Sequence, residues 1–177
     1  MAARTVPRSA QKSSGQLITG ALWNAGEWAL GNFLLNVPMF RGRQSAAQTT
    51  ADNVWLAMSL DVTDVDTDSG HSNSVNNSRY TCQVPGWYYV EGYFALASGG
   101  NLSQFECAIA KNGSIVVGSP QFLLHQVDLQ SLMAGSLVQL AVGDYVETWG
   151  RQHTGGNLNT FAGSDLCPCM NLFWVHS

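Results

Sequence analysis

Charged side chains are scarce in this sequence. Only 11% of the 177 residues are Asp, Glu, Lys or Arg, whereas about a quarter is usual for a soluble domain. Hydrophobic residues make up 45% of the chain, so we expect a packed core and exclude wholesale disorder. A surface with so few charges is either covered by partner molecules or built from neutral polar residues. Both alternatives suit a component of a particle or fibre better than a free cytosolic enzyme.

Long apolar runs are also missing. No segment approaches the ~20 consecutive apolar residues that a membrane-spanning helix requires, so no membrane partner is expected. Basic residues occur near the N-terminus, but the segment after them is interrupted by Thr19, Gly20, Asn24 and Glu27. A secretory signal needs an unbroken apolar stretch there. The sequence therefore predicts synthesis in the cytoplasm.

Cysteines are few and lack the paired spacing of zinc or thioredoxin sites. Cys167 and Cys169 are separated by one proline, which puts both thiols on one face of an extended chain, and Cys82 and Cys107 stand apart. Because no export signal is found, the sequence favours reduced core thiols over disulfides.

The few charges are unevenly distributed. Residues 1–43 contain five basic residues and one acid, whereas the remainder contains three basic residues and eleven acids. A basic segment joined to an acidic body indicates two parts with different tasks. Residues 17–35 are apolar but interrupted by three glycines, which allows either a broken helix or an extended clamp. We therefore divide the chain into an N-terminal arm, residues 1–36, and a body, residues 37–177.

The body has the pattern of an all-β domain. Short runs rich in Val, Leu, Tyr, Trp and Phe are separated by turn clusters at regular spacing, which is typical of a β-sandwich or barrel. Strands are predicted at 37–42, 54–61, 79–82, 86–97, 104–111, 114–117, 121–126, 135–141, 144–150 and 166–175. A polar loop is predicted at 64–77, and turns at 98–101, 112–113, 141–144 and 153–159.

Two of these strands are apolar on both faces. One face of strand 86–97 carries Tyr88, Val90 and Phe94, and the other carries Trp87, Tyr89 and Tyr93. Phe173 lies on the outer face of strand 166–175 by the same alternation. A free antiparallel sandwich needs only one apolar face. We expect the second face to be covered, either by another subunit or by the N-terminal segment folding back.

Three motifs in the body occur in an order that is typical of one protein family. The stretch Arg-Tyr-Thr-Cys-Gln-Val-Pro-Gly-Trp-Tyr-Tyr-Val begins at Arg79, an Asn-Gly hairpin follows, and Leu140–Val146 matches Leu-x-x-Gly-Asp-x-Val. In this order the motifs resemble the C1q-like domain, the trimeric jelly roll shared with tumour necrosis factor. The residues that carry the resemblance are Tyr80, Pro85, Gly86, Tyr88, Asn112, Gly113, Gly143, Asp144 and Val146.

The resemblance covers residues 37–177 and has structural implications. It implies an all-β fold, a C1q/TNF-like jelly-roll β-sandwich, preceded here by an extended N-terminal arm. It also implies a homotrimer, whose interface we expect at Trp87, Tyr89, Tyr93 and Phe173. The last strand departs from the family, because it lacks the glycine of the usual Phe-x-Gly-Phe.

The arm resembles a second group of proteins. Trp-Asn-Ala-Gly-Glu at 23–27, followed by Asn-Phe-Leu-Leu-Asn-Val-Pro at 32–38, is similar to the leader of structural proteins from tailed bacteriophages, particularly those of actinobacteria. In that group a similar leader precedes a C1q-like body. The resemblance implies a virion protein at the particle surface.

The residue pattern contains no recognisable catalytic motif. A Ser–His–acid hydrolase needs a positioned triad, but the histidines lie in loops or at strand ends without a nucleophile elbow: His71, His125, His153 and His176. We therefore expect no enzymatic activity and no cofactor. The first 43 residues carry only five basic side chains, a density of positive charge too low to favour nucleic acid as a partner.

An acidic run raises the question of calcium. The carboxylates are Asp61, Asp64, Asp66 and Asp68. An EF-type loop needs a glycine and a bidentate Glu at positions where this chain has Ser69 and Val75. The run is therefore interpreted as a solvated acidic loop, while calcium binding by some C1q-like trimers keeps the alternative open.

Together these features predict a trimeric capsid decoration or cement protein of a bacteriophage virion. Its arm would bind the major capsid protein or another virion protein. The alternative is the receptor-binding tip of a tail or head fibre, although a tip usually follows a stalk longer than the 36 residues found here. The residues expected to dock the arm are Trp23, Trp28, Phe33 and Leu34, with Arg4, Arg8 and Lys12 reaching an acidic patch.

Overall fold

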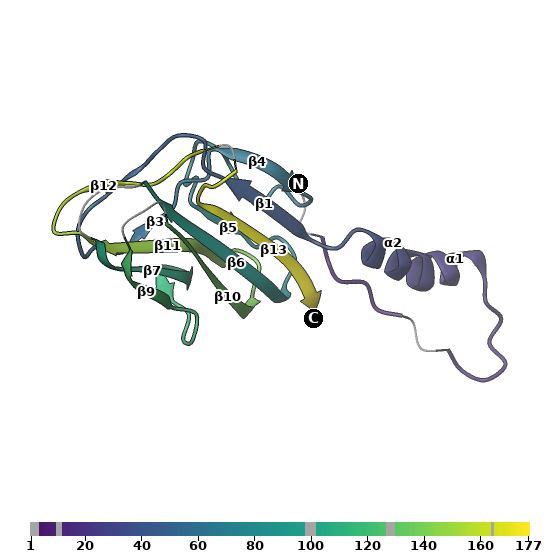
Figure 1. Cartoon of the computed structure of the whole chain (residues 1–177). Coiled ribbons are helices and arrows are strands. Elements are labelled where there is room, and N and C mark those ends of the chain that lie inside the picture. The colour runs from purple at the N-terminus through teal and green to yellow at the C-terminus, as the bar shows by residue number, and fades with distance from the viewer. Residues whose placement is uncertain (1–3, 10–11, 98–101, 127–129, 164) are drawn as a thin grey trace.

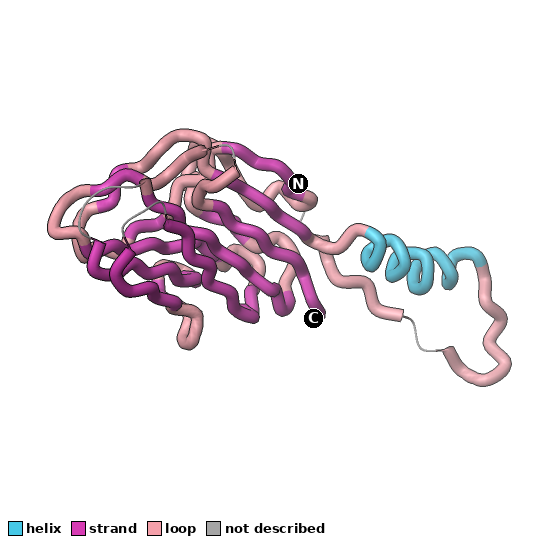
Figure 2. Tube along the Cα trace, in the orientation of Figure 1, coloured by secondary structure: helices cyan, strands magenta, loops and turns pink. Residues whose placement is uncertain are grey.

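The computed structural model describes residues 4–9, 12–97, 102–126, 130–163 and 165–177. It consists of two packed antiparallel sheets and an arm that projects from one end of them (Figure 1). All helical residues of the described chain lie in the arm, and the body is built from strands and loops (Figure 2). This confirms the all-β prediction for the body.

Five strands form the first sheet, in the order β10-β6-β13-β1-β4. Their bounds are Met39–Arg43 (β1), Val62–Asp66 (β4), Gly86–Leu96 (β6), Gln130–Leu140 (β10) and Cys169–His176 (β13). The first strand of the body lies beside the last, with Met39 opposite Phe173. The two ends of the body are therefore hydrogen-bonded to each other within one sheet.

The second sheet has the central order β3-β11-β7-β8, with β5 paired to β11 and β9 paired to β7. Its strands are Leu56–Ala57 (β3), Arg79–Thr81 (β5), Leu102–Lys111 (β7), Ser114–Ile115 (β8), Gln121–Gln126 (β9) and Tyr145–His153 (β11). A small separate pair joins Thr49–Thr50 (β2) to Leu158–Asn159 (β12).

The core lies between the two sheets and follows the predicted alternation. On β6, Tyr88, Val90 and Phe94 are fully buried. Phe94 packs against Phe105 of the second sheet, with ring centroids 6.3 Å apart. Each such side chain contributes about 1.5–3 kcal/mol by leaving water, so the inner face of β6 holds the two layers together.

Two family-motif turns are joined by side chains. Asn112 and Gly113 have φ angles of 49° and 78°, which suit a two-residue hairpin. The Asn112 carboxamide accepts from the Tyr145 N–H at 2.9 Å and donates to Asp144 at 2.8 Å. A hydrogen bond from Lys111 is the main cause that lowers the pKa of Asp144 to about 2. The Asn-Gly hairpin and the Gly-Asp turn therefore brace each other.

Gly86 is required by a close approach. A Cβ atom at this position would lie 2.3 Å from Nε1 of Trp174, and the backbone has a φ of 152°. The same indole donates to the Pro85 carbonyl at 3.3 Å. The Pro-Gly pair of the motif thus positions the Trp174 side chain of β13.

The arm folds into an irregular helix. It runs through Gly20–Trp23 (α1), a π-helical segment Asn24–Trp28 (η1) and Ala29–Leu35 (α2), and leads back toward the sandwich (Figure 1). Thr19 caps its start by accepting from the Leu22 N–H at 3.3 Å. Of the two predicted alternatives, the structure has the helix. No helix among the described residues is long and apolar enough to cross a membrane.

Several predicted boundaries need correction. The polar loop predicted from residue 64 begins later, because 62–66 form the edge strand β4, paired with β1. Strand 135–141 begins earlier, since β10 pairs with the whole of β6. Only Leu56–Ala57 of the predicted strand 54–61 is extended in a ladder. The turn predicted at 98–101 lies outside the described residues.

Candidate interaction surface

The outer face of the first sheet carries a row of apolar side chains across four strands. Leu137 on β10 lies opposite Tyr89 on β6, Tyr89 opposite Phe173 on β13, and Phe173 opposite Met39 on β1. Leu137, Phe173 and Met39 are 56%, 47% and 44% exposed. The rings of Tyr89 and Phe173 lie 5.7 Å apart. We call these four residues the apolar row.

A polar row runs beside the apolar row, two residues along each strand. It contains Glu91 on β6, Asn171 on β13 and Arg41 on β1, which lie opposite one another in register. Nε of Arg41 pairs with Asp64 at 3.1 Å. Glu91 forms no ion pair with any described residue, and the Asn171 Oδ1 atom has no hydrogen-bond partner among them.

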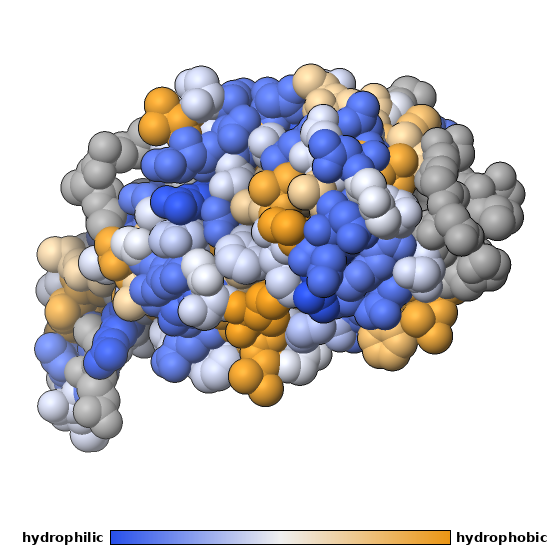
Figure 3. Space-filling view, turned by 90° about the vertical axis from the view of Figure 1, so that its left-hand side faces the viewer, coloured by the Kyte–Doolittle hydropathy of each residue, from blue (hydrophilic) through white to orange (hydrophobic). Residues whose placement is uncertain are grey.

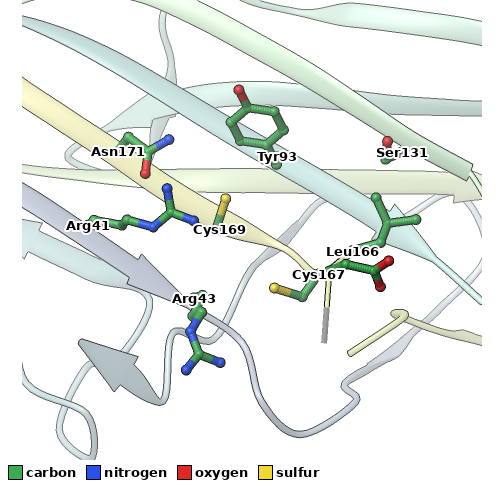
Figure 4. Close-up of a pocket in the computed structure, with 9 residues that line it drawn as sticks. Arg41, Arg43, Tyr93, Ser131, Leu166, Cys167, Cys169 and Asn171 are labelled. Carbon is green, nitrogen blue, oxygen red and sulfur yellow. The ribbon is translucent and has the colours of Figure 1, made fainter. Parts of the chain in front are cut away.

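Beyond the polar row, Tyr93 on β6, Cys169 on β13 and Arg43 on β1 lie opposite one another and border a pocket of about 320 Å³ (Figure 4). Arg41 and Arg43 reach it from β1, Cys169 and Asn171 from β13, and Tyr93 from β6. Burial raises the pKa of the Cys169 thiol to about 11, so this thiol is neutral at pH 7 and a poor nucleophile. The pocket is therefore a polar recess in the outer face of the first sheet.

The predicted interface residues all lie on this face. Trp87, Tyr89 and Tyr93 are partly exposed there, and Trp87 stacks on His176 with ring centroids 6.3 Å apart. The sequence analysis missed Met39 and Leu137, along with the whole polar row. An alternation signal existed at 39–43 and 131–139, but it becomes readable only once the strand bounds are known.

Two residues predicted to dock the arm onto a partner are used within the chain instead. Phe33 is 3% exposed and packs edge-on against Trp174, with ring centroids 5.0 Å apart. Arg4 pairs with Asp68 at 3.1 Å and lies over the Phe33 ring at 5.2 Å. We therefore correct their assignment, because these contacts attach the arm to the sandwich.

Most of the other predicted docking residues are exposed, whereas the Nζ atom of Lys12 is buried against the chain. Trp23, Trp28 and Leu34 are 51%, 61% and 58% exposed. Arg8 is exposed, and Lys12 is half-buried. Further exposed apolar residues that the sequence analysis did not single out are Leu17, Ile18 and Leu35. The helix thus presents apolar groups that the described residues leave uncovered.

The acidic run is divided among separate partners. Asp61 accepts from the Ser45 N–H and hydroxyl; burial alone would raise its pKa, but these hydrogen bonds outweigh it and the pKa is lowered. Asp64 pairs with Arg41 and Arg43, and Asp66 accepts from backbone N–H groups. Among the described residues, no group of three or more His, Cys, Asp and Glu side chains is arranged to hold a metal ion.

The outer face of the second sheet is charged and internally paired. Arg151 donates to both carboxylate oxygens of Glu106, at 2.8 and 2.7 Å, and its guanidinium lies 4.7 Å from the centroid of the Trp55 ring. Nε of Arg79 donates to one carboxylate oxygen of Glu147 at 3.1 Å, and the guanidinium lies 4.0 Å from the centroid of the Tyr145 ring. Each buried carboxylate thus has a cation stacked on an aromatic ring.

Comparison with known proteins gives a relationship in fold. No family model matches the sequence, and no curated protein matches it. The structure is similar to the globular domain of zebrafish complement 1qA protein, with a TM-score of 0.52 and 16% sequence identity. The likeness covers 78% of this chain and 98% of that chain. It shows a C1q-like jelly-roll β-sandwich, as the sequence analysis predicted.

Proposed function

We propose that this chain is a structural protein of a bacteriophage virion, a trimeric decoration or cement protein that its N-terminal arm attaches to the particle. Residues 1–36 are the arm and residues 37–177 the trimer-forming body. The C1q-like fold supports the body assignment. The phage assignment is supported by the resemblance of the leader at 23–38 to virion proteins. The partner of the arm is the major capsid protein or another virion protein.

The observation that carries the proposal is the helix of the arm. Trp23, Trp28 and Leu34 are more than half exposed, and a buried aromatic removes roughly 150–250 Å² from water. Phe33 packs against Trp174 at the base of the arm, and the helix projects from the sandwich (Figure 1). Exposed tryptophans on a projecting helix are anchors for a protein surface.

The trimer proposal is supported by the first sheet. The apolar row spans four strands on a face that the rest of the described chain leaves open. Contiguous apolar groups of this kind mark an interaction site. Three copies arranged about a threefold axis would cover three such rows and leave none in water.

The two ends of the sandwich suit a protein attached to a particle. The arm leaves one end (Figure 1). The opposite end is mostly hydrophilic, with hydrophobic side chains in separate groups (Figure 3). In the proposed arrangement the arm end faces the particle and the hydrophilic end faces the surrounding water.

The oligomeric state is the first test. Size-exclusion chromatography with light scattering on the full chain should give the mass of three protomers. A monomer at micromolar concentration would contradict the trimer. Crosslinking at low concentration checks that the three chains form one closed ring rather than a mixture.

The arm is tested by double substitution of Trp23 and Trp28 with Ser. We expect a trimer that melts like the wild type but no longer binds particles assembled without this protein. The matched control replaces Val117, an exposed residue of the body, with Ser. Normal decoration by the arm variant would contradict the anchoring role. Binding to host cells rather than to particles would instead support a fibre tip.

A further inference from the structure

The polar row interrupts an otherwise apolar docking face. Glu91 lies between the aromatic side chains of Tyr89 and Tyr93 on the outer side of β6. Its negative charge is the main cause that raises the pKa of Tyr89. No described cation pairs with Glu91. The face therefore holds one carboxylate without a counter-charge.

A trimer interface over this face would remove Glu91 from water. Burying a carboxylate without a partner costs free energy, and a cation with good geometry offsets that cost. Removal of an unpaired charge from water would oppose the assembly that the apolar row favours. A trimer that closes over Glu91 therefore needs a cation from the neighbouring protomer.

Unused donors lie on the other half of the same face. Arg41 and Arg43 share one carboxylate, that of Asp64, and each uses Nε for that contact. The terminal amino groups of Arg41 donate to no described residue. Figure 4 shows the Arg41 guanidinium beside Asn171, over the sheet. The face thus has surplus donors on β1 and surplus acceptors at Glu91 and at the Asn171 Oδ1 atom.

Within one chain the two charges are kept apart. Glu91 on β6 and Arg41 on β1 flank β13 in register with Asn171, so they are separated by two strand spacings, about 10 Å. Arg41 turns toward Asp64 on the far side. Opposite charges at the two halves of one face are complementary between copies of the chain.

We infer that Arg41 of one protomer pairs with Glu91 of the next protomer in the trimer. This inference rests on the trimer of the proposed function. In a closed ring of three, each protomer offers one half of its contact surface to each neighbour, so three pairs form. The pair makes the register of the interface specific, which the apolar row alone does not.

Charge exchange tests the pair in the full chain. The variants E91R and R41E each place like charges at all three interfaces, and we expect at least a tenfold weaker trimer in both. The double variant R41E/E91R restores opposite charges at all three and should recover the trimer. A mixture of the two single variants should recover it in part, because a ring with two chains of one kind pairs two of its three interfaces.

Controls separate this inference from the trimer proposal. E27R makes the same change on the exposed arm helix and should leave the trimer unchanged. R41E also loses the contact with Asp64, so its melting is measured by circular dichroism. E91R breaks no ion pair of the described chain and carries the test if R41E fails to fold. A monomeric wild type overturns both proposals. If the wild type is a trimer and E91R forms an equally stable one, the ion pair is wrong but the trimer stands. The same conclusion follows if the double variant forms no more trimer than the weaker single variant.

Discussion

The two outer faces of the sandwich differ in whether their carboxylates form ion pairs within the chain. On the second sheet, Glu106 and Glu147 are only 6% and 4% exposed, and each has an arginine within hydrogen-bond distance. On the first sheet, Glu91 has no ion pair with any residue that the structure describes, and the apolar row is open to water. The outer face of the second sheet therefore has its carboxylates paired within the chain, whereas the outer face of the first sheet leaves a carboxylate and apolar side chains without partners among the described residues.

The difference lies in which residues the sheet register brings together. Arg151 faces Glu106 directly across β11 and β7, so the pair forms inside the chain. Arg41 and Glu91 are separated by a whole strand and do not meet. Removing one partner of a buried ion pair is destabilising, whereas apolar groups left open to water mark an interaction site. The contrast is consistent with the proposal that the chain assembles through the first sheet.

The largest effect is expected from breaking the apolar face. Replacing Phe173 with Asp puts a charge in the middle of the apolar row and should abolish the trimer completely. The fold should survive, because the side chain points away from the core. Light scattering reports the mass and circular dichroism the melting. Val117→Asp, at an exposed turn, is the matched control. A Phe173→Asp trimer would remove the basis for the contrast between the faces.

The next largest effect is expected from breaking the paired face. Arg151→Ala removes the two hydrogen bonds from Nη2 to Glu106 and leaves Gln104 and His153 as its side-chain partners, so we expect a loss of about 2 kcal/mol in the free energy of unfolding. The trimer should persist while the protein is folded. Urea unfolding measures the loss. Adding Glu106→Gln should recover part of it, because a neutral amide costs less to bury; equal stability of the single and double variants would contradict this account.

A smaller effect is expected at the exposed ion pair between the two motif turns. Asp144 has a pKa of about 2 in the folded chain against 3.8 for the free side chain. Its stabilising contribution is therefore present above about pH 4 and is lost as the pH falls toward 2. Asp144→Asn should cost about 1 kcal/mol at pH 7, because the charge-assisted bond to Lys111 is lost at a site open to solvent. Urea unfolding at pH 7 and pH 2.5 should show that difference shrink.

The smallest effect concerns the thiols, and it changes labelling rather than stability. Burial raises the pKa of Cys107 to about 12 and also raises that of Cys82. At pH 8 iodoacetamide should therefore label Cys167, which is half exposed, well before the buried thiols. Mass spectrometry counts the labels before and after unfolding in denaturant. Four labels on the unfolded chain are expected, and two missing labels would indicate a disulfide.

The motifs in the sequence predicted the sandwich and the two faces of its long strand β6, but not the edge strand β4. Alternation along 86–97 separates inward Tyr88 from outward Tyr89, because strand geometry alone sends neighbouring side chains to opposite faces. The Asn-Gly pair predicts its hairpin for a similar local reason, since both residues tolerate positive φ. The arm was harder to predict. Its glycines weaken the helical pattern, yet the segment is helical in the folded chain.

The sequence by itself determined the all-β class, the inward and outward faces of β6 and the positions of the Asn-Gly and Gly-Asp turns, because each depends on residues within a few positions. The contact between the two turns, from Asn112 to Asp144, is a tertiary contact. The tertiary structure decided which side chains share a row and which charges pair. Met39 lies opposite Phe173, and Arg4 pairs with Asp68 beside the packed Phe33. Such contacts join residues far apart in the chain, and their choice depends on the register of whole strands. No local pattern specifies that register, so only the folded sandwich reveals a face with an apolar row and an unpaired carboxylate.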